Sequence, residues 1–329
     1  MSKVTGVLGR LNGNSSVFKK LNISSTGMAF IVLLATWLLS ALLIGGFETK
    51  EHNIQVLQTA AFLGIVAAGQ TIVVMMAGID LSVSSIITLS AVVTSSFVSK
   101  LGVDPVFAIV LGLLISTGIG FINAMGVTLL KLPPMIMTIA MVSIIEGSML
   151  IFTNGTPPSG TSPVISNLAN STWFFGLPNV VFIWLLVSIF VFWFLNKSVW
   201  GRQIYSLGTN EKTSVLSGIS VAKMNIIGYC LSGFFAGLAG ILLFGYMGSS
   251  YLTMGAPYQL YSIAAVVLGG TSILGGRGNY LGTIAGALLI IILKDVLTVV
   301  NISMAGREVF LGLLILIILF AYGRERKQR

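Results

Sequence analysis

Charged residues are scarce in this sequence: Asp, Glu, Lys and Arg together make up 8% of its 329 positions. A soluble globular domain carries about 25% charged residues, so this chain could not cover an aqueous surface with charge. Hydrophobic residues make up 55% of it, and the mean hydropathy is +0.99. These proportions exclude a soluble globule and a disordered chain. They predict an all-α, polytopic integral membrane protein.

Cysteine and histidine are almost absent, with Cys230 and His52 the sole residues of each type. A single cysteine cannot form an intrachain disulfide, and one Cys with one His argues against a metal site. The motifs G-x-x-x-x-G-K-[ST], H-E-x-x-H and G-x-S-x-G are also missing. We therefore expect no metal, no cofactor held by this chain and no catalytic activity of its own.

Long apolar runs occupy most of the chain, and each is long enough to cross a bilayer as a helix. The first run, 27–47, is too long for a signal-peptide core and is interpreted as an uncleaved span. Gly and Ser are frequent around 70–90 and 257–275, which predicts broken or re-entrant helices there. About ten spans are expected, at 27–47, 54–78, 81–99, 105–130, 133–153, 179–195, 226–248, 257–275, 280–300 and 307–323.

The basic residues orient these spans. The net charge of +9 comes from Lys and Arg at the ends of apolar runs, where they set topology rather than bind nucleic acid. With the N-terminus inside, the loop 196–225 and both tails hold most of the positive charge, while Lys50, Lys100 and Arg307 fall outside. The positive-inside rule then predicts two cytoplasmic termini. The expected organisation is a cytoplasmic tail over 1–26, one transmembrane domain over 27–323 and a cytoplasmic tail over 324–329.

Few ionisable residues lie in or near the spans: Asp80, Glu146, and the neighbours Lys294 and Asp295. Asp80 is expected to cap a helix that begins near Leu81. A proton or sodium relay needs an array of acids, so energy for uphill transport is expected to enter from outside the chain, through the polar loop 196–225. A self-sufficient ion-coupled transporter that uses Glu146 remains the alternative. A membrane enzyme is disfavoured because no catalytic constellation is present.

Three segments carry a family resemblance: GQTIVVMMAGIDLSVSS (69–85), GRQIYSLGTNEKTSVLSGISVAKMNIIGYCLSGFFAGLAG (201–240) and YSIAAVVLGGTSILGGRGNYLGTIAGAL (261–288). They resemble the permease subunits of bacterial ABC importers for sugars, of the ribose/xylose/galactoside class. The likeness runs in the same order from about 54 to 323. It implies a multi-pass inner-membrane subunit that forms the path for a monosaccharide or related polyol.

The resemblance also implies partners. Two ATPase domains would use the ATP, a periplasmic binding protein would deliver the sugar, and a second permease subunit, identical or paralogous, would complete the path among membrane lipids. The segment Thr209–Leu216 would be the helix that inserts into the ATPase. The residues that match the family's coupling motif are Gly208, Thr209, Asn210, Glu211, Ser217 and Gly218.

Sugar sites combine aromatic faces with amide, carboxylate and hydroxyl groups, and several such residues lie near the expected path. The sequence departs from the family in two informative places: Ser84 stands where Gly is usual, and Glu146 where many relatives carry Arg. An opposite charge on a paralogous subunit would account for Glu146. The candidate path residues are Gln70, Thr71, Asp80, Ser82, Thr138, Glu146 and Tyr261.

Overall fold

The computed structural model describes residues 24–326, and this part of the chain folds into 13 helices. Most of the expected N-terminal tail, and residues 327–329, lie outside the described part. The helices are α3 (Ser25–Leu43), α4 (Lys50–Met75), α5 (Val83–Ser99), α6 (Pro105–Thr128), α7 (Pro134–Thr153), α8 (Pro163–Asn170), α9 (Asn179–Lys197), α10 (Val199–Thr209), α11 (Glu211–Leu216), α12 (Val221–Met247), α13 (Ala256–Leu268), α14 (Tyr280–Val299) and α15 (Met304–Arg326).

Seven of these helices are long and apolar enough to cross a membrane, which confirms a polytopic membrane protein. They are α3, α4, α6, α7, α9, α12 and α14. Two shorter apolar helices, α5 and α13, also lie within the bundle. Each apolar run of the sequence overlaps one helix, and the last of them overlaps α15.

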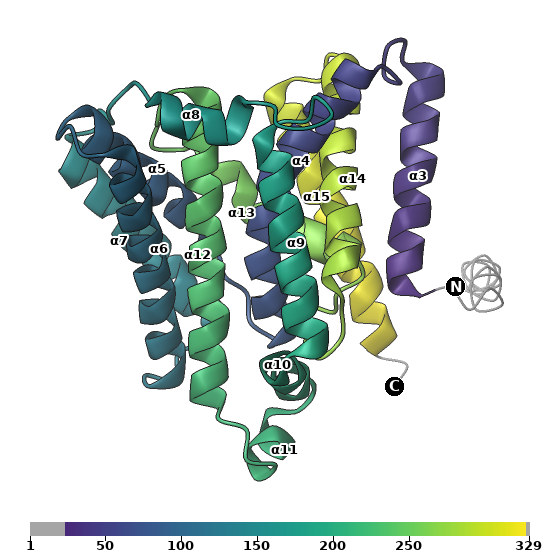
Figure 1. The fold of residues 1–329 in the computed structure, drawn as a ribbon. Helices are drawn as coiled ribbons and strands as arrows, with labels where there is room; N and C mark the ends of the chain where they lie inside the picture. Colours follow the sequence, from purple (N-terminus) through teal and green to yellow (C-terminus); the bar gives the residue numbers. More distant parts are fainter. Residues whose placement is uncertain (1–23, 327–329) are drawn as a thin grey trace, which may run out of the picture.

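The segments 154–178 and 196–225, which separate apolar runs, lie at opposite ends of the bundle. Figure 1 shows α8 lying across one end, while α10 and α11 project from the other. Chain segments on the α8 side are joined by an isolated β-bridge between Ser159 and Ser249. We call these two sides of the molecule the α8 end and the α11 end.

Small residues let the central helix α12 approach its neighbours closely. A methyl group added to Gly120 of α6 would collide with the carbonyl oxygen of Tyr229 on α12. In return, a methyl group on Gly233 of α12 would collide with the carbonyl oxygen of Ser116 on α6. Membrane helices gain little from hydrophobic association, so close backbone packing through small residues is what holds them together.

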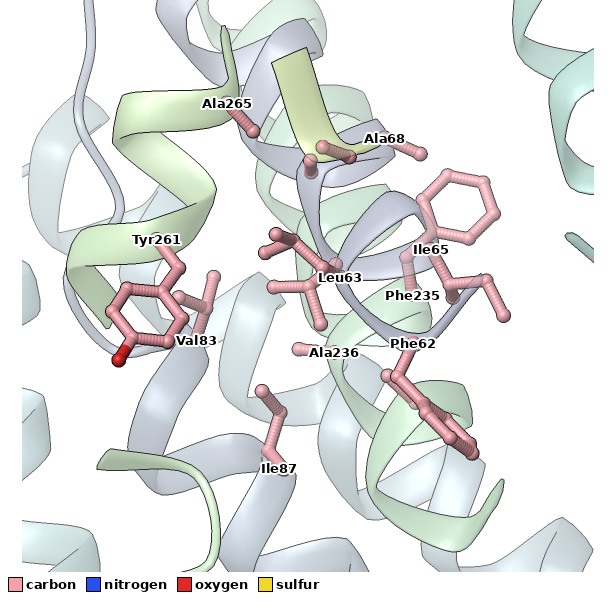
Figure 2. Close-up of a cluster of buried hydrophobic side chains, with 14 of the residues drawn as sticks. Phe62, Leu63, Ile65, Ala68, Val83, Ile87, Phe235, Ala236, Tyr261 and Ala265 are labelled. Carbon is pink, nitrogen blue, oxygen red and sulfur yellow. The ribbon is translucent and has the colours of Figure 1, made fainter. Parts of the chain in front are cut away.

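The core lies where α4, α5, α12 and α13 meet. Figure 2 shows Leu63 of α4 among side chains from the other three helices, including Ile87, Ala236 and Tyr261. Helix α4 is the most enclosed of the candidate spans. Among the candidate spans, α4 is therefore the helix that the others surround most completely.

Two interruptions occur close to where Gly and Ser are enriched. Helix α4 ends at Met75, and α5 begins only at Val83. Ala77 between them has a φ of 61°, a left-handed conformation that costs a non-glycine residue energy. Helix α13 likewise ends at Leu268, and the turn 269–279 leads into α14. We refer to residues 76–82 as the first break and to residues 269–279 as the second break.

Candidate coupling site and translocation path

The residues expected to contact an ATPase form a helix–cap–helix unit at the α11 end. Asn210 has extended backbone angles, so it ends α10 and begins α11. Its side-chain oxygen accepts a hydrogen bond from the Thr213 amide at 3.1 Å, the usual role of an N-cap. The expected single helix Thr209–Leu216 is therefore wrong at its start: Thr209 belongs to α10, and α11 spans Glu211–Leu216.

Helix α11 is capped at its other end as well, and all its residues except Ser214 are exposed. Gly218 adopts a φ of 80°, and the Ile219 amide donates to the carbonyl of Ser214 at 3.0 Å. This is the left-handed C-terminal cap for which glycine is suited. Glu211 is exposed, and Leu216 is 87% exposed. A short, capped helix with an exposed apolar end is a surface fitted for docking into a groove.

Gly208 fixes the end of α10 against the transmembrane bundle. A side chain at this position would collide with the carbonyl oxygen of Met75, the last residue of α4. Gly276 of the second break donates its amide hydrogen to that same oxygen at 3.0 Å. Tyr205 of α10 donates its hydroxyl to the carbonyl of Gly278 at 2.8 Å. Helix α10 is thus in direct contact with the second break and with the end of α4, just before the first break.

Asp80 lies at the centre of a buried hydrogen-bond network. Its Oδ1 accepts from the amide of Ser82 at 3.0 Å and from the Ser82 hydroxyl at 2.6 Å. Its Oδ2 accepts from the hydroxyl of Ser232 on α12 at 2.8 Å. Asn123 of α6 donates to the Ser82 hydroxyl at 2.8 Å, and Thr138 of α7 accepts from the Leu81 amide at 3.1 Å. This network ties the first break to three helices.

The expectation that Asp80 caps the next helix is wrong, because the N-cap position lies two residues further along the chain. Helix α5 begins at Val83, and its N-cap residue Ser82 makes no side-chain cap bond. The Asp80 carboxylate instead accepts a hydrogen bond from the amide of Ser82, just before the helix begins. Asp80, Ser82 and Thr138, all candidate path residues, are therefore brought together, but inside the chain.

Gln70 and Thr71 are also enclosed within the chain. Both are fully buried in α4. The hydroxyl of Thr71 lies 2.9 Å from that of Thr283 on α14, whereas neither side-chain polar atom of Gln70 has a hydrogen-bond partner. A buried amide without a hydrogen-bond partner costs free energy. Gln70 would therefore be stabilised by a rearrangement that brings a polar group within reach of its side chain.

Glu146 and Tyr261 lie in a different region of the chain. This region consists of α7, α5, α13 and α15, each of which contacts the next. Glu146 is exposed on α7. An α-helix advances about 100° per residue, which places Glu146 about 80° around α7 from Thr138. Glu146 therefore lies on the opposite face of α7 from Met137, which packs against Gly126 of α6.

Tyr261 of α13 donates its hydroxyl to Glu308 of α15 at 2.6 Å. Sequence reasoning missed Glu308, although a carboxylate just inside the last apolar run was a visible signal. The hydrogen bond between Tyr261 and Glu308 places these two residues side by side.

The family model described as "Branched-chain amino acid transport system / permease component" matches residues 53–319. The chain belongs to this permease family. As a member, this permease is a transport subunit without a catalytic domain, and ATP is hydrolysed by a partner ATPase. It is a multi-pass membrane protein of a bacterial ABC importer family, whose assemblies also include a binding protein.

Several curated relatives align with nearly the whole permease. The ribose import permease protein of Bacillus subtilis (strain 168) is 35% identical over 88% of this chain and 89% of its own length. The fructose import permease protein of Rhizobium meliloti is 34% identical over 90% of this chain and 85% of its own. The D-allose transport system permease protein of Escherichia coli (strain K12) is 30% identical over 88% and 89%. No solved structure matches this permease.

Proposed function

We propose that this chain, paired with a second permease subunit, forms the path by which a monosaccharide or related polyol crosses the inner membrane. Two ATPase domains drive the cycle from the α11 end, and a periplasmic binding protein delivers the sugar at the α8 end. The observation that carries this proposal is the capped, exposed helix α11 at one end of an apolar bundle. The sugar permeases that align along almost the whole chain support the solute class.

The proposed topology has ten spans and two cytoplasmic termini. Ten apolar helices, with α5, α13 and α15 among them, match the ten apolar runs of the sequence. The basic residues Arg202, Lys212 and Lys223 lie in or beside α10 and α11, at the end opposite α8. The positive-inside rule therefore supports a cytoplasmic α11 end.

The proposed solute-facing residues are Glu146, Tyr261 and Glu308. A carboxylate that faced lipid at mid-span would cost about 2.5–3.5 kcal/mol, so the exposed Glu146 is expected to face water or a partner chain. Glu308, exposed but bonded to Tyr261, is subject to the same constraint nearer the α8 end. A second subunit seated over α5 and α13 would enclose these groups in a polar channel, where carboxylate oxygens accept hydrogen bonds from sugar hydroxyls.

The other candidate path residues take a different role in this proposal. Asp80, Ser82 and Thr138 hold the first break in place, and Thr71 joins α4 to α14. Gln70, which lacks a hydrogen-bond partner, is the interior residue that we expect to become accessible during the transport cycle. Alternating access requires such internal rearrangement, since the path must open to each side in turn.

Uptake into proteoliposomes tests the proposal. The importer is reconstituted with its ATPase and binding protein, and accumulation of radiolabelled ribose, fructose and allose is followed with and without ATP. We expect at least one sugar to accumulate in an ATP-dependent manner, and we expect ionophores to leave this accumulation unchanged. Uptake that continues without an ATPase, and that ends when ion gradients are collapsed or in Glu146→Gln, would refute it and favour ion-coupled transport.

A further inference from the structure

We infer that the ends of α4 and α10 and the second break form one rigid unit that transmits movement of α11 to both breaks at once. This inference rests on the proposed function and names the residues that position the moving parts. We call the unit the backbone junction. It consists of residues 75–77, 208–209 and 275–278.

Backbone atoms, rather than side chains, make the principal contacts of the backbone junction. The carbonyl oxygen of Met75 accepts a hydrogen bond from the Gly276 amide at 3.0 Å, and the missing side chain of Gly208 leaves room for that same oxygen. A methyl group on Gly275 would lie 2.8 Å from the Ala77 nitrogen and 2.8 Å from the Gly208 oxygen. Three segments far apart in sequence therefore touch with no compressible side chain between them.

Two further hydrogen bonds connect the backbone junction to α11. Tyr205 of α10 donates to the carbonyl of Gly278 at 2.8 Å. Burial raises the pKa of the Tyr205 phenol, so this group keeps the proton that it donates at neutral pH. The hydroxyls of Ser206 and Ser214 lie 2.9 Å apart, and they join α10 to α11 across the Asn210 cap.

Movement of α11 therefore has a short route into the membrane domain. Close-packed backbone resists compression, so a displacement passes on as a rigid-body shift. On one side it reaches the first break, where Asp80 is bonded to Ser232 of α12. On the other side it reaches the second break, which directly follows α13, the helix that carries Tyr261. The second of these routes ends at Tyr261, a residue of the proposed path.

The alternative is that these glycines merely allow the chain to pack. Both interpretations predict that a bulkier residue at Gly208 is harmful, so stability alone cannot separate them. They differ in the number of sugar molecules transported per ATP hydrolysed. Loss of folded protein lowers transport and sugar-stimulated ATP hydrolysis in proportion, whereas loss of transmission lowers transport alone.

The test measures this ratio in proteoliposomes that contain the complete importer. Gly208→Ala inserts a methyl group into the backbone junction, and Tyr205→Phe removes one hydrogen bond with no added volume. Gly118→Ala on α6, where a methyl group meets no atom within 4 Å, is the control for the first variant. Tyr251→Phe, in the segment between α12 and α13, is the control for the second.

We expect the ratio to fall at least tenfold in Gly208→Ala and about threefold in Tyr205→Phe, as for the loss of one hydrogen bond, with both controls unchanged. An unchanged ratio in Tyr205→Phe would overturn the inference, and so would an equal fall in the controls. If Gly208→Ala does not fold, Tyr205→Phe decides alone. Absence of ATP-driven uptake by the unaltered importer would instead refute the proposed function.

Discussion

Removal of the Asp80 carboxylate should destabilise the chain far more than removal of a surface carboxylate. In Asp80→Ala, the buried amide of Ser82 loses its acceptor, and the hydroxyls of Ser82 and Ser232 lose theirs. Each unsatisfied buried group costs about 1–3 kcal/mol. The two hydroxyls can turn toward other oxygens and recover part of their loss, but the amide cannot, so its full cost adds to what the hydroxyls still lose. We therefore expect a loss of about 3–5 kcal/mol in the free energy of unfolding.

Unfolding of the purified chain in mixed micelles, followed by tryptophan fluorescence, measures this loss. Asp104→Ala is the matched control, because Asp104 caps α6 from an exposed position and should cost only about 1 kcal/mol. Asp80→Asn keeps one carbonyl acceptor and should cost less than about 2 kcal/mol. A loss in Asp80→Ala no larger than that of Asp104→Ala would contradict the role given to the network.

Three other predictions follow from single contacts. Asn210→Ala removes the cap of α11, worth about 1 kcal/mol, so the affinity for the ATPase should fall about fivefold in a binding assay; equal affinity would argue against docking by α11. Gly120→Ala should lower the free energy of unfolding by about 1–3 kcal/mol, whereas Gly118→Ala should not lower it. Glu308→Gln keeps the acceptor for Tyr261 and should retain most sugar uptake, while Glu308→Leu should lose about tenfold; equal uptake would remove Glu308 from the path.

The sequence predicted the helical membrane fold well because the signals are local. An apolar run long enough to span a bilayer is visible without any knowledge of its neighbours, and each run overlaps a helix. The interruptions were expected from Gly and Ser alone. Position within the bundle was not predictable: the run 54–78 contains the most enclosed span and the run 27–47 the least enclosed, although both are almost uniformly apolar.

The candidate site was predicted in part. The position of the segment 196–225 at one end of the bundle was predictable because its polar composition interrupts the apolar pattern. The break at Asn210 was not, because it depends on one extended residue whose side chain caps the next helix. The partners of Asp80 could not be found from spacing, since Ser232 follows more than a hundred positions later. The contact of Gly208 with Met75 was equally invisible, because a glycine gives no sign of which backbone approaches it.

The position of α12 has a consequence for biogenesis. The helices that it touches most closely, α4, α5 and α6, are synthesised long before it, yet α6 and α12 meet through glycines that leave no room for lipid between them. The earlier helices therefore cannot complete their packing until α12 has been synthesised. Lipid that occupies the position of α12 before then must be displaced when this helix inserts. Chains truncated before residue 221 should accordingly be the ones that quality-control proteases recognise as unfinished.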